Sequence, residues 1–217
     1  MNELRSQRYW RNRPPEERLI NTEIPKRYRK DTLDSFKWPA KDADTKSLVT
    51  RWVENAEEMC EQGQGLYICG GTGSGKTHIA QAILKRVVYT KNLSGMFVTA
   101  EGYIQMADNK RDFKDDYPDG YEDPNTMKYL QEVFDIVVVD SLGIERDTEY
   151  SRRTITTLLQ SRYHNQLPTI ITSVLKPAQL ESVYNASIAS LVHDCCLVAP
   201  LKGSDYRITK WVEENAG

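Results

Sequence analysis

Gly70-Gly71-Thr72-Gly73-Ser74-Gly75-Lys76-Thr77 is the stretch of the chain that decides its fold. It matches the pattern G-x-x-x-x-G-K-[S/T], whose glycines let backbone N–H groups close around phosphate oxygens at the N-terminus of a helix. Lys76 is expected to reach the β- and γ-phosphates, and the Thr77 hydroxyl to ligate Mg²⁺. The pattern predicts an ATP-binding loop with contacts from Gly71, Thr72, Gly73, Ser74, Gly75, Lys76, Thr77 and His78.

A loop of this kind needs an acidic side chain for the metal, and residues 134–140 supply one. Their sequence, FDIVVVD, has the continuous apolar character of a parallel strand that is buried on both faces. Asp140 ends this strand. We therefore expect Asp140 to hold Mg²⁺ through water, together with the Thr77 hydroxyl.

Apolar segments alternate between strand and helix patterns along the chain, which predicts an α/β fold with a parallel sheet sandwiched between helices. In a P-loop NTPase this sheet is expected to have five strands. We expect strands over 66–69, 95–99, 135–140 and 169–173, and helices over 45–62, 77–89, 147–164 and near 177–193.

The C-terminal end and one internal stretch are less regular. Residues 196–199 continue the apolar pattern, and a last strand is expected over 206–211. The stretch 108–124, rich in acids with Pro and Gly, is expected to be an exposed loop.

Composition excludes several classes of protein. Of the 217 residues 39% are hydrophobic, enough for a sizeable core. No apolar run approaches the ~20 residues of a membrane span, and no secretory signal opens the chain. The four cysteines show no CxxC spacing, which argues against a zinc ribbon or a disulfide framework. We expect a reducing, cytoplasmic location.

Charge is distributed unevenly along the chain. Residues 1–30 carry nine Lys or Arg against four Glu, a balance of +5, although the whole chain has a net charge of −2. We divide the chain into a basic N-terminal arm (1–30) and an ATP-binding domain (31–217). The arm is a candidate partner-binding segment or a solvated leader.

The chain resembles the AAA+ ATPases of the bacterial helicase-loader group (DnaC and DnaI) and the related IstB transposition helpers. The resemblance rests on IPKRY and TLDSF (24–28, 32–36), GSGKTHIA (73–80), DSLGIE (140–145), PTIITS (168–173) and DYR (205–207). It implies an AAA+ domain with a reduced C-terminal lid that binds ATP and Mg²⁺, with Arg207 as a late nucleotide contact. It also implies ATP-dependent self-association, single-stranded DNA and a replicative hexameric helicase as partners.

Three positions depart from the family pattern. Ser141 stands where an acid usually orients the attacking water, Val174 stands in place of an Asn, and Ser190-Leu191 lacks an expected arginine. We take Asp140 and Glu145 as the catalytic candidates, since Glu145 lies close enough in sequence to replace the missing acid. The missing arginine has candidate substitutes in Arg152, Arg153 and Arg162, and hydrolysis is expected to be weak.

Three functions therefore stay open. The chain is a loader of the replicative helicase onto single-stranded DNA, a transposition helper that acts on duplex DNA, or a scaffold that binds ATP without hydrolysing it. The short basic arm, without a separate DNA-binding extension, favours loading. The sequence leaves open which protein is the partner and how many subunits assemble.

Overall fold

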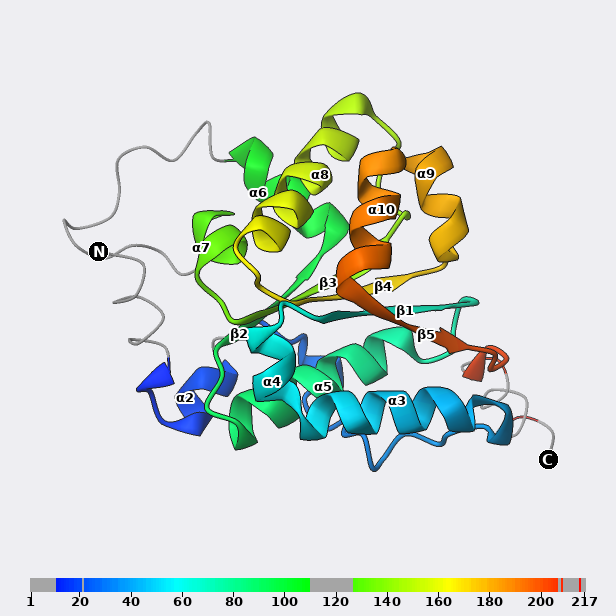
Figure 1. The fold of residues 1–217 in the computed structure, drawn as a ribbon. Coiled ribbons are helices and arrows are strands. Elements are labelled where there is room, and N and C mark those ends of the chain that lie inside the picture. The colour runs from blue at the N-terminus through cyan, green and yellow to red at the C-terminus, as the bar shows by residue number, and fades with distance from the viewer. Residues whose placement is uncertain (1–10, 21, 110–126, 207, 209–214, 216–217) are drawn as a thin grey trace.

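Five parallel strands in the order β2-β3-β4-β1-β5 form the centre of the molecule (Figure 1). This computed structural model describes residues 11–20, 22–109, 127–206, 208 and 215. The strands are β1 (Gly65–Gly70), β2 (Gly95–Thr99), β3 (Ile136–Leu142), β4 (Thr169–Ser173) and β5 (Cys196–Leu201). The expected five-stranded parallel sheet is confirmed.

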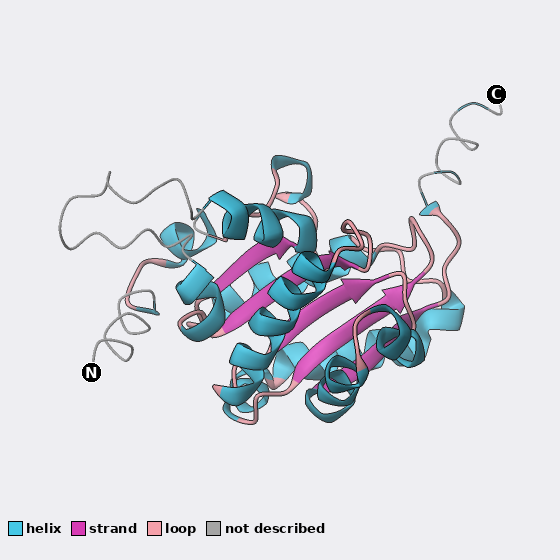
Figure 2. Cartoon of the chain, turned by 90° about the horizontal axis from the view of Figure 1, so that it is seen from above, coloured by secondary structure: helices cyan, strands magenta, loops and turns pink. Residues whose placement is uncertain are grey.

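Helices cover both faces of the sheet (Figures 1 and 2). One face carries α6 (Ala100–Asn109), α7 (Met127–Glu132), α8 (Glu149–His164), α9 (Leu180–Val183) and α10 (Ala186–Cys195). The opposite face carries α2 (Pro15–Ile20), α3 (Ala43–Glu54), α4 (Ala56–Glu61) and α5 (Lys76–Thr90). Short 3-10 helices are η1 (Lys26–Tyr28), η2 (Ala40–Asp42) and η3 (Pro177–Gln179). Among the helices described, none is both long and apolar enough to cross a membrane.

Each strand divides its side chains between two hydrophobic cores. In β1, Leu66 and Ile68 join the core beneath α3 and α5, whereas Tyr67 joins the core beneath α8 and α10. In β3, Ile136 and Val137 alternate in the same way. This two-residue alternation explains why β1 and β3 have continuous apolar sequences, since both faces of these strands are buried.

The helix expected over 45–62 is interrupted at Asn55, which separates α3 from α4. The Asn55 side-chain amide donates to the Arg51 carbonyl oxygen at 2.8 Å, and the Asn55 backbone N–H donates to the same oxygen at 3.1 Å. Asparagine side chains compete with the backbone for hydrogen bonds in this manner, which favours a helix boundary.

The fifth strand is Cys196–Leu201, and the last strand expected over 206–211 is wrong where the structure describes it. Tyr206 and Ile208 are helical, whereas residues 207 and 209–214 lie outside the described part of the chain. The stretch after α10 pairs along the whole length of β1, from Gly65 to Gly70, and completes the sheet. The Tyr206 N–H then donates to the Gly73 carbonyl oxygen at 3.0 Å. Most of the loop expected over 108–124 lies outside the described residues.

The described part of the basic arm packs against the body of the molecule. Thr22 accepts a hydrogen bond from Phe97 of β2 at 2.8 Å, and α2 lies against α5. Arg11 pairs with the buried Asp135 carboxylate, its Nε donating at 3.0 Å. Arg18 is 5% exposed and donates to the Asn92 side chain. These arginines therefore make intramolecular contacts, and partner binding by the arm stays a prediction.

Arg162 is fully buried between α8 and the sheet, so it cannot serve a neighbouring subunit as an arginine finger. Its guanidinium donates to Thr169 Oγ1 at 3.0 Å and to the main-chain oxygens of Leu130 (2.7 Å), Phe134 (3.1 Å), Asp135 (3.2 Å) and Pro168 (2.8 Å). Burial lowers the pKa of Arg162 to about 9, while the nearby Asp135 carboxylate opposes that shift. Arg162 holds together α7, β3, β4 and α8.

Replacing Arg162 with methionine keeps most of its apolar bulk but leaves five buried acceptors without their donor. We expect the free energy of unfolding to fall by about 3 kcal/mol or more, measured by urea denaturation. Arg153→Met, at an exposed position of the same helix, should change it by less than about 0.5 kcal/mol. Equal stability of the two variants would contradict the role given to Arg162.

Candidate nucleotide-binding site

The phosphate-binding loop connects the end of β1 to the N-terminus of α5, as the sequence pattern predicts. Gly73 (φ +70°) and Gly75 (φ +96°) adopt the left-handed conformation that favours glycine. A side chain at Gly75 would also collide with the Phe36 ring, because its Cβ would lie 2.3 Å from Phe36 Cε2. The loop thus needs glycine for its own conformation and for the approach of a distant segment.

A cavity of about 780 Å³ opens above this loop, a volume within the range of small-molecule sites. Its floor is the loop from Thr72 to Thr77, followed by His78. Asp140 and Ser141 line it from the end of β3. The remaining wall comes from residues in the range 27–39 and from Ile144, Val174, Gly203, Ser204 and Tyr206. Of the predicted loop contacts, Gly71 lies at the exposed outer edge and does not line the cavity.

Lys76 reaches back over the loop. Its ammonium donates to the carbonyl oxygens of Gly70 at 2.9 Å and Gly71 at 2.7 Å. The side chain is 9% exposed, so the charge is held close to the loop and away from bulk water. An anionic phosphate oxygen would be a stronger acceptor for this ammonium than a neutral carbonyl.

Asp140 lies at the centre of a cluster of hydroxyl groups. Thr77 Oγ1 donates to Asp140 Oδ1 at 2.8 Å, so the two residues proposed as metal ligands lie in contact. Thr172 Oγ1 donates to the same oxygen at 2.7 Å, and Ser141 Oγ donates to Oδ2 at 3.1 Å. Hydroxyl and carboxylate oxygens are hard donors of the kind that Mg²⁺ prefers, so this donor set fits that ion.

A bulge in β3 creates the arrangement. Pairing with β4 shifts register between Val139 and Leu142, and Ser141 adopts φ +65°, which is uncommon for a residue other than glycine. The Ser141 N–H therefore points to Thr172 Oγ1, at 2.9 Å, instead of to a strand carbonyl. Thr172 is fully buried on the neighbouring strand. Its hydroxyl closes the bulge and fixes the Asp140 carboxylate at the same time.

Glu145 is held within its own turn. One carboxylate oxygen accepts from the backbone N–H groups of Gly143 (2.8 Å) and Ile144 (3.1 Å), and the other accepts from the Tyr184 hydroxyl. Burial, and next the hydrogen bond to Glu145, raise the pKa of Tyr184. Glu145 would have to give up these bonds to reach a water beside a γ-phosphate, so its catalytic role stays a prediction.

The three positions that depart from the family pattern lie in different surroundings. Ser141 and Val174 both line the cavity, Val174 with 36% of its surface exposed. Leu191 is buried in α10. Arg152 pairs with Asp147 at 3.1 Å. Arg207 lies outside the described residues, although its neighbour Tyr206 lines the cavity.

The resemblance includes residues 24–28, 32–36 and 168–173 but assigns no role in the site to Thr172 or to the cavity wall formed by residues 27–39. A signal for Thr172 existed, because a hydroxyl inside the buried strand Thr169–Ser173 must find a hydrogen-bond partner. The wall segment overlaps two motifs of the resemblance, but its local sequence does not predict a contact with the cavity, since that contact joins residues far apart in the chain.

Solved structures and characterised relatives place this fold among replication proteins. A crystal structure of the DnaC helicase loader matches with 26% identity and a TM-score of 0.71, covering 82% of this chain and all of that one. The replicative helicase loader DnaI of Bacillus subtilis is 30% identical over 142 residues. The replication initiator DnaA of Onion yellows phytoplasma is 28% identical over 134 residues. The fold is that of the AAA+ P-loop NTPases.

These matches cover unequal parts of the proteins compared. The DnaI alignment spans 64% of this chain but 42% of DnaI, and the DnaA alignment spans 59% of this chain but 24% of DnaA. Residues 4–213 of this chain match the family described as IstB-like ATP binding protein, which is nearly the whole sequence. The chain therefore belongs to the IstB-like ATP binding protein family.

Proposed function

We propose that this chain binds ATP with Mg²⁺ and acts in DNA replication as a loader of the replicative helicase onto single-stranded DNA. The observation that carries the nucleotide part is the contact of Thr77 with Asp140 at the mouth of a cavity floored by the phosphate-binding loop. The loading part is supported by similarity to proteins described as helicase loaders, DnaC and DnaI.

Each residue of the site has a separate task in binding. The Lys76 ammonium exchanges its two carbonyl acceptors for phosphate oxygens, and the N-terminus of α5 supplies further donors. Thr77 and Asp140 would hold Mg²⁺, which neutralises charge on the phosphates when bound. Thr172 and Ser141 orient the Asp140 carboxylate toward that position.

Binding and turnover depend on different residues here. Phosphoryl transfer needs a positioned water and a cation near the γ-phosphate. Ser141 and Val174 stand at the cavity where the family pattern has an acid and an Asn, and the buried Arg162 offers no cation to a neighbour. We infer that bound ATP acts mainly as a signal for self-association, with slow hydrolysis.

The second candidate is a transposition helper, which the family description favours. The two candidates differ in the partner retained. Immobilised protein with ATP should retain a purified replicative helicase and not a transposase if it is a loader.

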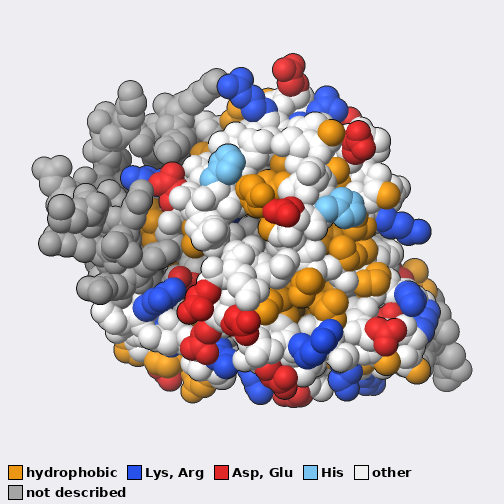
Figure 3. Space-filling model, viewed as in Figure 1, with side chains coloured by type: hydrophobic (Ala, Val, Ile, Leu, Met, Phe, Trp, Pro, Cys, Tyr) orange, Lys and Arg blue, Asp and Glu red, His pale blue; other side chains and the backbone are white. Residues whose placement is uncertain are grey.

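Positive and negative side chains are interspersed among the described residues on the face seen in Figure 3. We therefore expect DNA contact on another face and in the assembled oligomer.

Lys76→Ala removes the cation that the loop directs at phosphate. We expect ATP affinity, measured by calorimetry, to fall at least tenfold, about 1.4 kcal/mol, and ATP-dependent helicase retention to be lost. Lys91→Ala, in a partly exposed ion pair with Glu57 at the end of the same helix, is the matched control. Unchanged ATP affinity in Lys76→Ala would exclude the proposed site.

Thr172→Val preserves shape but removes the hydroxyl that joins Ser141 to Asp140. Calorimetry with and without Mg²⁺ gives the factor by which Mg²⁺ increases ATP affinity. We expect this factor to be about five- to tenfold smaller in Thr172→Val, or ~1 kcal/mol, and ATP affinity without Mg²⁺ to be unchanged. Thr172→Ser should retain the gain, and Thr157→Val, at an exposed position of α8, should not affect it. An undiminished Mg²⁺ effect in Thr172→Val would show that this hydroxyl has no part in the site.

Phosphate release in the presence of DNA and helicase should stay well below about one turnover per second. The physical reason is the absence of an acid at position 141 together with the engagement of Glu145 in its own turn. Turnover above that rate would contradict this expectation. If Glu145→Gln then abolished it while Glu149→Gln did not, Glu145 would be the catalytic base.

A further inference from the structure

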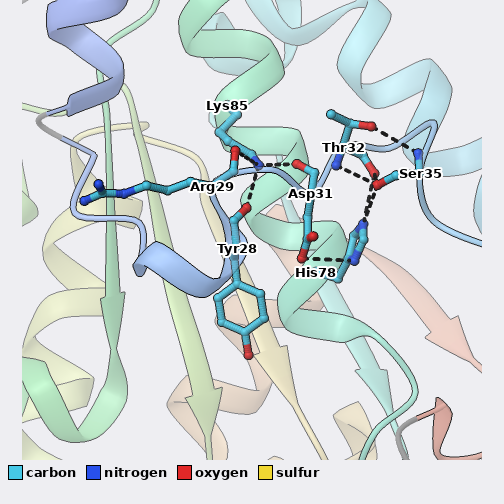
Figure 4. A network of polar contacts seen from close by, with 7 residues as sticks. All are labelled: Tyr28, Arg29, Asp31, Thr32, Ser35, His78 and Lys85. Carbon is cyan, nitrogen blue, oxygen red and sulfur yellow. Dashed lines mark hydrogen bonds and ion pairs between the residues drawn. The ribbon is translucent and has the colours of Figure 1, made fainter. Parts of the chain in front are cut away.

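Lys85 of α5 has its ammonium surrounded by carbonyl oxygens from a segment far earlier in the chain (Figure 4). It donates to Tyr28 at 2.8 Å, to Arg29 at 3.2 Å and to Asp31. These carbonyls lie at the end of η1 and just after it, where a helix end leaves oxygens without intrahelical partners. Burial lowers the pKa of Lys85, which agrees with an ammonium enclosed by the segment.

His78, on the same helix beside the phosphate-binding loop, makes the second attachment (Figure 4). Its Nε2 contacts the Thr32 carbonyl oxygen at 2.9 Å, and its Nδ1 lies 3.4 Å from the Asp31 carboxylate. Thr32 and Ser35 close a turn by two reciprocal hydrogen bonds. The Thr32 N–H donates to Ser35 Oγ at 2.9 Å, and the Ser35 N–H donates to Thr32 Oγ1 at 3.0 Å. We name residues 26–39 the lead-in segment. Its backbone is thus joined to α5 at two places.

The side chains of the lead-in segment line the nucleotide cavity. Tyr28, Asp31 and Phe36 all face it, and the Phe36 ring covers Gly75. Phe36 is itself positioned by an edge contact with Trp38, at 4.8 Å between ring centroids, and by His78 at 5.2 Å. Because the phosphate-binding loop would bind the phosphates, we expect the lead-in segment to contact the base and ribose.

We propose that Lys85 is a positioning residue that fixes the lead-in segment as the nucleoside wall of the cavity. It does not line the cavity, so it acts on nucleotide affinity only through the backbone of residues 28–31. The proposal rests on the nucleotide-binding function inferred above. It predicts that the affinity for the nucleoside part depends on Lys85 and the affinity for the phosphate chain does not.

The test compares Lys85→Met with the parent and with Lys91→Met. Calorimetry with ATP and with inorganic tripolyphosphate separates the two parts of the ligand. We expect Lys85→Met to lose at least tenfold in ATP affinity while its tripolyphosphate affinity stays within twofold of the parent. Lys91→Met should match the parent for both. Equal losses for ATP and tripolyphosphate, or no loss for ATP, would overturn the proposal.

Amide hydrogen exchange in the absence of ligand tests the attachment independently of nucleotide. In Lys85→Met, amides of residues 26–39 should exchange at least tenfold faster, while amides of β1 and β3 keep the parent rate. Lys85→Arg, which keeps a cation and several donors, should recover part of both effects and provides a second variant if Lys85→Met does not fold. Unchanged exchange in the segment would refute the attachment. A parent that binds no ATP, with the exchange result as expected, would instead refute the proposed function.

Discussion

The candidate site depends on the hydrogen bond from the Thr77 hydroxyl to the Asp140 carboxylate, at 2.8 Å, and the rest of the structure brings these two groups together. Thr77 lies in the first turn of α5, after the loop that follows β1, and Asp140 lies near the C-terminal end of β3. The strands β1 and β3 are not neighbours in the sheet. β4 runs between them, and Thr172 of that strand fills the gap with a hydroxyl. A parallel sheet brings the C-terminal ends of all three strands to one edge, where open α/β folds bind their ligands.

The two aspartates near the ends of β3 have different electrostatic surroundings. Asp140, at the cavity, is surrounded by neutral hydroxyls and stays available to a cation. Asp135, at the other end, is bonded by Arg11 and by both donors of Ser94. The buried Arg162 binds main-chain oxygens beside it. One carboxylate is therefore committed to structure, and the other is kept for the ligand.

Much of this site follows from local sequence, because the loop pattern and the apolar strand before Asp140 each depend on neighbouring residues. What could not be foreseen joins residues distant in the chain. Arginine is rarely buried, so nothing in the sequence marked Arg162 as a core residue. Lys85 reads as a surface lysine until residues 28–31 are folded over it. The last strand predicted over 206–211 is wrong because apolar and polar residues alternate only from Tyr206 to Thr209, and Cys196–Leu201 already completes the pairing with β1.

The two outer strands of the sheet, β2 and β5, have little capacity to accept another strand. The outward N–H of Phe97 in β2 is already bonded to Thr22. In β5, Pro200 has no N–H to offer, and its carbonyl oxygen accepts from Thr45 Oγ1 at 2.6 Å. Exposed strand edges otherwise template pairing between chains and lead to aggregation. The self-association proposed above would therefore use side chains and loops, and its reversal would not require strands of different subunits to separate.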